Sequence, residues 1–264
     1  MDNYKKIFLD TCILSDIGRM DKEKRAKLAY EFLVNKKYKI IVPTYILDEL
    51  ERIPDKQVKE NVYDFLELSY VGFPKGADKI FREELEANIN NKKVEIVEFN
   101  VSMLQKDCNG ITMDFKNFKD NLLNNNTFKI VTNQNEQVKR YLQKQKRPLT
   151  NIEDYFNLIV LNHLYNYKIL KLDYNIFPGF TVWAYSLANK IESKGLKKKF
   201  NELNDVAMSY VVPYVDIIIA ENRQINIYRQ MKDKKMLECL NDVILKKYNE
   251  VFENGEFIVG NIEK

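Results

Sequence analysis

Two short strand-like segments, one near each end of the chain, finish directly in an acidic residue. Residues 6–9 are closed by Asp10, and residues 215–220, the most strand-like segment in the sequence, are closed by Glu221. A short apolar run bounded by polar residues is typical of a strand buried inside a parallel sheet. Since such a strand needs neighbours on both sides, the two ends of the chain are expected to fold into one sheet.

The segments next to these strands alternate between helix and strand patterns. Residues 22–35 have apolar residues at helical spacing, and residues 38–42 form a strand-like run that Pro43 stops. Thr44 can cap a following helix, which Pro54 ends. Alternating strands and helices indicate an α/β fold with a parallel sheet. Towards the C-terminus, the pattern predicts a helix over residues 200–212, the strand over 215–220, a helix over 223–248 and an edge strand over 257–259.

The middle of the chain has a different pattern. Residues 57–194 contain amphipathic helical segments, such as 58–70 and 152–167, with one strand-like piece at 94–99. We therefore predict a three-layer α/β/α domain with a central, mainly parallel sheet, built from residues 1–56 and 195–264. Residues 57–194 are predicted to form a large, mainly helical insertion. The length of 264 residues is enough for one large domain or two small ones.

Composition excludes several kinds of chemistry. Cys12, Cys108 and Cys239 are far apart and lack a CxxC spacing, so neither a zinc knuckle nor a disulfide framework is indicated. His163 is the single histidine and lies in an apolar helical run. One histidine supplies no histidine acid-base pair, so hydrolysis would have to use carboxylates. With no export signal and no membrane-spanning run in the sequence, we expect a cytoplasmic protein without a membrane partner.

The net charge of +4 gives no global basic field. A nucleic-acid partner would therefore need basic residues gathered locally, and two Lys-rich stretches, 139–147 and 194–199, are candidates. Solvated helix faces explain such stretches more often. The charge pattern alone leaves both interpretations open.

Four acids are predicted to meet at one edge of the sheet. Asp10 and Glu221 end strands, while Glu49 and Asp205 lie on predicted helices that run beside the same edge. Ligands of open α/β sheets bind outside the carboxyl ends of the strands. Carboxylates crowded there repel one another, and a divalent cation removes that conflict. All-oxygen ligands favour Mg²⁺ or Mn²⁺ over zinc. The spacing fits equally well with turn residues and lysine-paired surface acids. Asp216 begins a strand, at the wrong end for this cleft.

At these residues the sequence resembles the PIN-domain nucleases. Residues 7–11 (IFLDT) are similar to the first strand of that family with its terminal Asp, and residues 44–50 (TYILDEL) to its helix carrying Glu before Leu. Residues 204–208 (NDVAM) resemble the third acidic motif, and residues 213–223 the last strand with its acid. The four motifs occur in the family's order and cover the two terminal segments. Two departures are the long gap between Glu49 and Asp205, and Glu221 where Asp is commoner.

The resemblance implies a metal-dependent endonuclease acting on RNA or on single-stranded DNA. Asp10 and Asp205 would be the main ligands of Mg²⁺ or Mn²⁺, Glu49 a ligand or an orienter of the attacking water, and Glu221 a ligand of a second ion or an outer residue. The substrate contacts would come from Thr11, Asn204, Arg223 and a basic patch of Lys144, Lys146 and Arg147 beside Tyr141. Helix capping explains Asn204 equally well, and a surface role is the alternative for Arg223.

Two rival hypotheses remain open at this stage. The first is a non-catalytic PIN-like module that binds nucleic acid or protein, which Glu221 makes conceivable. The second is a phosphohydrolase of small nucleotides or metabolites, against which the sequence lacks GxxxxGK[ST] and GxGxxG loops and has only 8 glycines. The insertion is open to roles as a lid, a substrate platform, or a surface for a homo-oligomer or protein partner.

Overall fold

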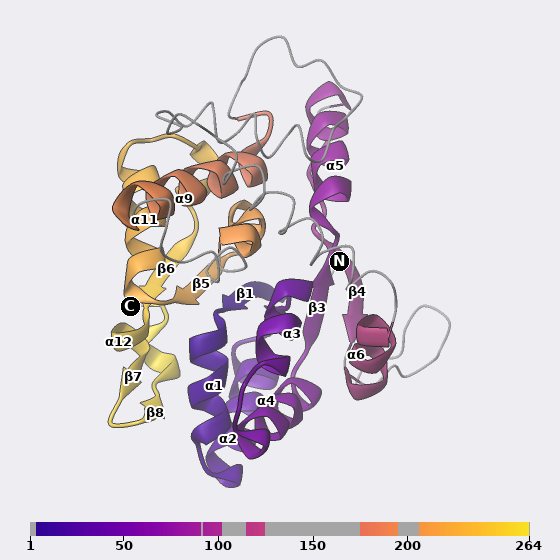
Figure 1. Ribbon diagram of the computed structural model, residues 1–264, viewed down its shortest axis with the longest axis vertical. Helices are drawn as coiled ribbons and strands as arrows, with labels where there is room; N and C mark the ends of the chain where they lie inside the picture. Colours follow the sequence, from indigo (N-terminus) through magenta and orange to yellow (C-terminus); the bar gives the residue numbers. More distant parts are fainter. Residues whose placement is uncertain (1–3, 91, 102–114, 125–174, 195–205, 264) are drawn as a thin grey trace.

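The computed structural model describes residues 4–90, 92–101, 115–124, 175–194 and 206–263 (Figure 1). Its centre is a six-stranded sheet with the order β4-β3-β2-β1-β5-β6. All neighbouring strands pair in parallel except β3 and β4, which are antiparallel. The predicted α/β class with a central, mainly parallel sheet is confirmed. The strands are β1 Lys5–Leu9, β2 Tyr38–Ile41, β3 Val71–Pro74, β4 Val97–Val101, β5 Ile217–Ala220 and β6 Ile244–Lys247.

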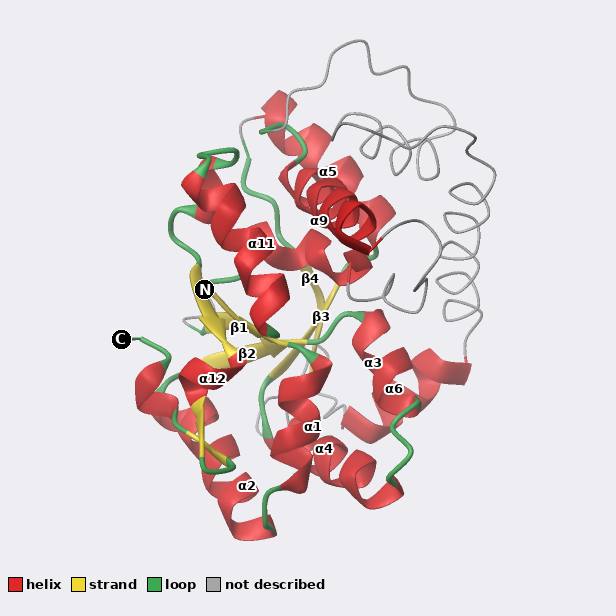
Figure 2. Cartoon of the chain, turned by 60° about the vertical axis from the view of Figure 1, so that its left-hand side comes forward, coloured by secondary structure: helices red, strands yellow, loops and turns green. Residues whose placement is uncertain are grey.

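Helices cover both faces of this sheet (Figure 2). One face carries α1 Thr11–Arg19, α2 Lys22–Tyr30, α3 Thr44–Glu51 and α4 Lys56–Leu68, with α6 Phe115–Asn124 beside them. The other face carries α5 Ala77–Asn90, α9 Pro178–Lys194 and α11 Asn222–Asp233. The shorter elements are the π-helix η1 Glu31–Asn35, the 3-10 helices η3 Met208–Tyr214, η4 Glu238–Leu240 and η5 Val259–Asn261, the helix α12 Tyr248–Val251, and the hairpin strands β7 Phe252–Glu253 and β8 Glu256–Phe257.

The two ends of the chain meet at β1. Ile7 stands opposite Ile40 of β2 on one side and opposite Ile217 of β5 on the other, and all three side chains are fully buried. Strands covered by helices on both faces need apolar residues at successive positions. The prediction that both ends of the chain contribute to one sheet is therefore confirmed.

The sheet also continues beyond residue 56. β3 and β4 fall within the range 57–194, and both belong to the central sheet. β4 overlaps the strand-like piece predicted at 94–99, whereas β3 was not predicted. Its four residues include Gly72 and Pro74, two residue types that usually weaken a strand pattern. Residues 91, 102–114 and 125–174 of this range lie outside the described residues, and the helical insertion stays a prediction.

The prediction of one long helix over residues 223–248 is wrong. α11 ends at Asp233, Lys235 adopts a left-handed backbone with φ of 52°, and Ile244–Lys247 forms β6 against β5. A left-handed residue stops a helix, and the open edge of β5 takes the following apolar segment as a strand. The predicted edge strand at 257–259 is also wrong, because Phe257 pairs with Phe252 in the separate hairpin. The described part of the helix predicted at 200–212 is mainly the 3-10 helix η3.

Close packing of α1 against α4 depends on a glycine. A Cβ added at Gly18 would stand 2.7 Å from the Val58 carbonyl oxygen and 2.8 Å from Val62 Cγ2. The first of these atoms belongs to the backbone of α4 and cannot rotate away. The absence of a side chain at Gly18 therefore sets the distance between the two helices.

We expect Gly18→Ala to destabilise the protein, although alanine favours a helix by about 1 kcal/mol over glycine. Overpacking of a close contact costs about 1–3 kcal/mol, and the melting temperature should fall by roughly 2–8 °C. Gly260→Ala is the matched control, since a Cβ there has no atom within 4 Å. Equal melting temperatures for the two variants in a thermal scan would contradict this account.

A buried carboxyl group joins α5 to α9 and η3. Glu84 is only 2% exposed, and its Oε1 accepts hydrogen bonds from the Gly179 N–H at 2.7 Å and from the Tyr214 hydroxyl. Its other oxygen, Oε2, is buried without a hydrogen-bond partner. Burial raises the pKa of Glu84 to about 8, although both hydrogen bonds lower it. The folded protein therefore holds Glu84 protonated at neutral pH.

This raised pKa predicts a pH dependence of stability. Between pH of roughly 4.5 and 8 the folded state keeps a proton that the unfolded state has lost, so stability falls as the pH rises, by at most about 1.4 kcal/mol per pH unit. Glu84→Gln, a neutral mimic, should flatten urea-denaturation midpoints measured across this range. Glu86→Gln on the exposed face of α5 is the control. An unchanged slope in Glu84→Gln would contradict the assignment.

Candidate functional site

Asp10 and Glu221 lie side by side at the carboxyl ends of neighbouring strands. Asp10 follows β1 and caps α1, and Glu221 follows β5 at the start of α11. The Asp10 N–H donates to the Ile219 carbonyl at 3.0 Å, and the Glu221 N–H lies 3.4 Å from Asp10 Oδ2. The structure thus brings the two strand-end acids together, as their positions in the sequence predict.

Glu49 joins this edge through Thr11. The Thr11 hydroxyl donates a hydrogen bond to Glu49 Oε2, while the Thr11 backbone N–H donates to Asp10 Oδ1 at 2.8 Å. Glu49 lies on α3, which begins just after β2 ends. One residue therefore connects the acid after β1 with the acid on the helix after β2. The sequence suggested a substrate contact for Thr11, whereas the structure shows it orienting a carboxylate.

Cys12 lies against these acids, and the sequence analysis did not assign it to the site. Its thiol donates to Asp10 Oδ2 at 3.6 Å. Burial, followed by the negative charges of Asp10 and Glu221, raises the pKa of the Cys12 thiol far above its ordinary value. The thiol stays neutral and is a poor nucleophile. The negative charges of Asp10 and Glu221 therefore both act on the half-buried Cys12 thiol.

Asp205 and Asn204 lie outside the described residues, but the segment that follows them is placed. Val206, Ala207 and Tyr210 are buried, and the Tyr210 hydroxyl donates a hydrogen bond to the Lys75 carbonyl at 2.9 Å. Burial and then the nearby Tyr45 raise the pKa of Tyr210. The chain just after Asp205 therefore packs near the helix that carries Glu49.

Of the other residues that the sequence predicts for the site, the structure describes Arg223 but not the basic patch. Arg223 is half-buried in the first turn of α11, two residues after Glu221. Lys144, Lys146, Arg147 and Tyr141 fall outside the described residues. Within the described ranges, no group of three or more His, Cys, Asp or Glu side chains is arranged to hold a metal ion. The described part of the site is thus a network of Asp10, Thr11, Glu49 and Glu221.

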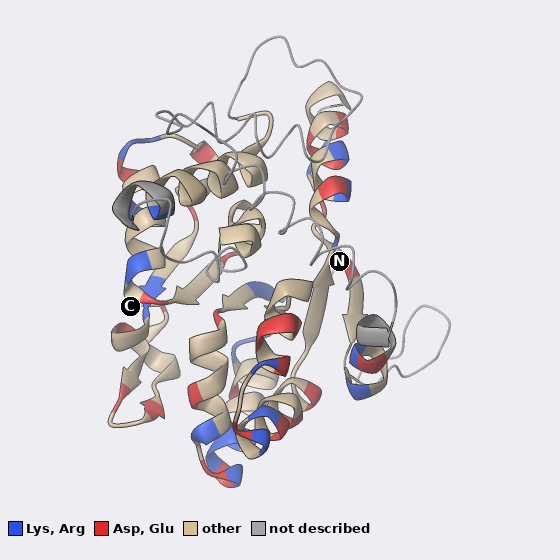
Figure 3. Cartoon of the chain, viewed as in Figure 1, with Lys and Arg blue, Asp and Glu red and all other residues tan. Residues whose placement is uncertain are grey.

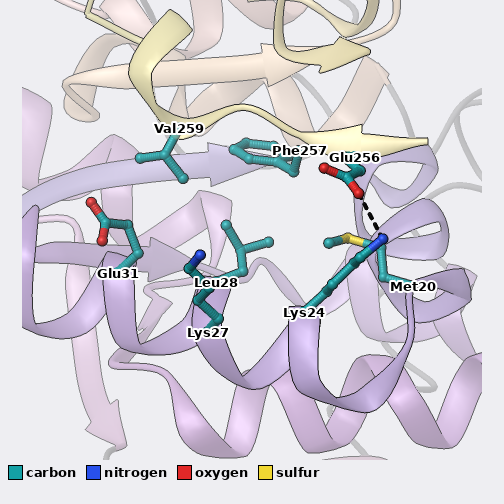
Figure 4. Close-up of a pocket in the computed structure, with 8 residues that line it drawn as sticks. All are labelled: Met20, Lys24, Lys27, Leu28, Glu31, Glu256, Phe257 and Val259. Atoms are coloured by element: carbon teal, nitrogen blue, oxygen red, sulfur yellow. Dashed lines mark hydrogen bonds and ion pairs between the residues drawn. The ribbon is translucent and has the colours of Figure 1, made fainter. Parts of the chain in front are cut away.

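Two cavities lie away from these acids. One, of about 340 Å³, separates α2 from the C-terminal segment, and the ion pair of Lys24 with Glu256 at 2.6 Å closes one end (Figure 4). The other, of about 370 Å³, lies at the amino end of β5, where Asp216 accepts a hydrogen bond from the Lys6 N–H at 2.6 Å. Asp10, Glu49 and Glu221 do not line either cavity. The position of Asp216 agrees with its interpretation as a residue at the wrong end for the cleft.

No protein-family model, curated protein or solved structure matches the chain. Among the described residues, no helix is long and apolar enough to cross a membrane. What the structure defines is therefore a class of fold, an α/β domain with acidic residues at the carboxyl edge of a mainly parallel sheet.

The contact between Thr11 and Glu49 predicts a difference between two substitutions. Thr11→Val keeps the shape of the side chain but removes the donor to Glu49, and we expect a loss of about 1–2 kcal/mol in the free energy of unfolding. Thr11→Ser keeps the hydroxyl and should retain most of the stability. Urea denaturation of both variants in EDTA provides the measurement. A serine variant as unstable as the valine variant would show that the methyl group matters and the hydrogen bond does not.

Proposed function

We propose that this chain is a Mg²⁺- or Mn²⁺-dependent endonuclease that hydrolyses phosphodiester bonds in RNA. The observation that carries the proposal lies at the carboxyl edge of a parallel sheet, where Thr11 joins Asp10 to Glu49 and the Glu221 backbone N–H approaches the Asp10 carboxylate. Enzymes with open α/β sheets place their ligands at this edge. The proposal includes a PIN-like fold, since the acids follow strands and helices in the order that the resemblance implies.

The donor set is suited to a hard divalent cation. The acids offer carboxylate oxygens, the ligands that Mg²⁺ and Mn²⁺ prefer. Burial first, and then the negative charges of Asp10 and Glu221, raise the pKa of the Cys12 thiol. A cation would relieve this crowding. Asp10 and Glu221, together with Asp205 from the sequence motif, would hold it.

A bound Mg²⁺ or Mn²⁺ would acidify the attacking water and neutralise charge on the leaving oxygen. Thr11 holds the Glu49 carboxylate in one orientation beside Asp10, from which Glu49 can accept a proton from water. The backbone N–H groups at the start of α1 and α11 face the same edge and favour negative charge there. No side chain needs to form a covalent bond with the substrate, which agrees with the neutral state of Cys12.

The RNA partner follows from the resemblance and from the basic residues of the chain. Arg223, in the first turn of α11 two residues after Glu221, would contact a phosphate of the substrate in this proposal. Lys144, Lys146 and Arg147 are proposed to contact RNA farther from the acids, with single-stranded DNA as the alternative substrate. A cytoplasmic location agrees with an RNA substrate and is part of the same proposal.

The test is cleavage of labelled RNA and DNA by the purified full chain in Mn²⁺, with EDTA as the metal-free control. We expect Asp10→Asn and Asp205→Asn each to lower kcat/KM for RNA at least about 100-fold, equivalent to about 2.7 kcal/mol of transition-state stabilisation. Asp242→Asn, an exposed acid at the opposite edge, should cleave like the unmodified protein.

Three outcomes separate the hypotheses. Cleavage that persists in EDTA or in both variants would overturn the assigned site. Binding of RNA without cleavage of any nucleic acid would favour the non-catalytic interaction module. Hydrolysis confined to mononucleotides would favour the small-nucleotide phosphohydrolase.

A further inference from the structure

Two consecutive lysines lie at the same edge of the sheet as the acids. β6 ends in Lys246 and Lys247, which stand opposite Ile219 and Ala220 of β5. Glu221 follows Ala220 directly, and the Asp10 N–H donates to the Ile219 carbonyl. By this register Asp10, Ala220 and Lys247 stand in one row, at one level across the ends of three strands, and Glu221 follows that level directly. Charged segments of both signs lie near the ends of β5 and β6 (Figure 3).

The distances across this row suit a chain of phosphates. Neighbouring strands lie about 4.8 Å apart, so the end of β6 is about 10 Å from the end of β1. This separation exceeds the size of one phosphate group. A lysine carries its charge on a flexible four-carbon stem and can reach a phosphate next to the one held by the acids. The row thus offers an acidic position and a basic position side by side.

Neither lysine forms an ion pair with a carboxylate in the part of the chain that the structure describes. Across the described ranges, no carboxylate lies within ion-pair distance of the ammonium group of Lys246 or Lys247. The nearest acid along the chain, Glu250, instead accepts bonds from Arg229 at 2.9 Å and from the Lys247 backbone N–H at 2.7 Å. Several other lysines do form ion pairs, including Lys24 with Glu256 and Lys116 with Asp64. The ammonium groups at the end of β6 thus form no ion pair within 4.0 Å among the described residues, although the charge of Lys246 helps to lower the pKa of Glu250.

The chain after these lysines turns towards the acids. Tyr248 follows Lys247, and the pKa of its hydroxyl is raised by burial and then by contact with Asp16 of α1. α1 begins at Thr11, so the start of α12 lies against the helix that Asp10 caps. Lysines on an edge strand also discourage pairing with other chains. However, β4, the opposite edge strand, has the sequence VEFNV and carries no lysine.

We propose that Lys246 and Lys247 bind a phosphate of a nucleic-acid strand next to the scissile one. This inference rests on the proposed function and adds a preference for a nucleic-acid strand over a mononucleotide. The acids act on one phosphodiester, and the lysines bind the neighbouring phosphate. Phosphate contacts give affinity without base preference, so the pair favours a continuous strand over a mononucleotide.

The test is binding of fluorescently labelled single-stranded RNA in EDTA, followed by anisotropy at several salt concentrations. We expect Lys246→Ala/Lys247→Ala to weaken binding about 10- to 100-fold, and to reduce the slope of log affinity against log salt by about 0.7 for each lost phosphate contact. The control is Lys22→Ala/Lys27→Ala, which removes two exposed charges from α2. Lys246→Gln/Lys247→Gln preserves side-chain length and should weaken binding similarly. Thermal melts confirm that each variant is folded.

Failure of this inference can be told apart from failure of the proposed function. If the unmodified protein binds and cleaves RNA while the β6 variants behave like the α2 control, the lysine assignment is overturned and the nuclease stands. If the unmodified protein binds RNA without cutting it, the affinities still decide the role of the lysines. If it neither binds nor cuts RNA, both proposals fail. In an active enzyme the β6 variants should raise KM for an oligonucleotide more than they lower kcat.

Discussion

The parallel pairing of β1 with β5 is the interaction on which the rest of the structure depends. It joins residues from opposite ends of the chain, with Ile7 against Ile217 and Leu9 against Ile219, all buried. Both strands point the same way, so their carboxyl ends share one edge and the acids after them become neighbours. In an antiparallel pair, Asp10 and Glu221 would lie at opposite edges. The direction of one strand pair thus determines whether this site exists.

Much of this arrangement can be predicted from the sequence, because buried parallel strands have a simple signature. The apolar runs of β1, β2 and β5 identify those strands, and the residues that end them identify Asp10 and Glu221 without a structure. β3 and β6 are harder to predict. β3 includes Gly72 and Pro74, and β6 ends in two lysines, so neither is a continuous apolar run. Both become strands because an existing sheet edge offers unpaired backbone groups, which is information from the fold rather than from the segment.

The site residues also divide into those that the sequence predicts and those whose role depends on the fold. Position along the chain suggested that Glu49 would join the edge, but the contact that brings it there, the hydroxyl of Thr11, depends on how α1 and α3 are oriented. The role of Cys12 was equally inaccessible, since nothing in its spacing indicates two carboxylates next to its thiol. Lys246 and Lys247 fell inside a wrongly predicted helix. They reach the edge only because residues 244–247 are a strand in register with β5.

The protein places its carboxyl groups in two physically different ways, and the contrast bears on function. Glu84 is sealed among α5, α9 and η3, where burial raises its pKa to about 8 and the group is held neutral. Asp10 and Glu221 instead stand at the starts of α1 and α11, where the partial positive charge of a helix N-terminus favours negative charge. A neutral carboxyl stabilises packing by hydrogen bonding, whereas adjacent ionised carboxylates repel. The folded chain gathers Asp10 and Glu221 at one edge of its sheet, next to Lys246 and Lys247 at the end of β6, so that a cation and a polyanion would each meet groups of opposite charge there.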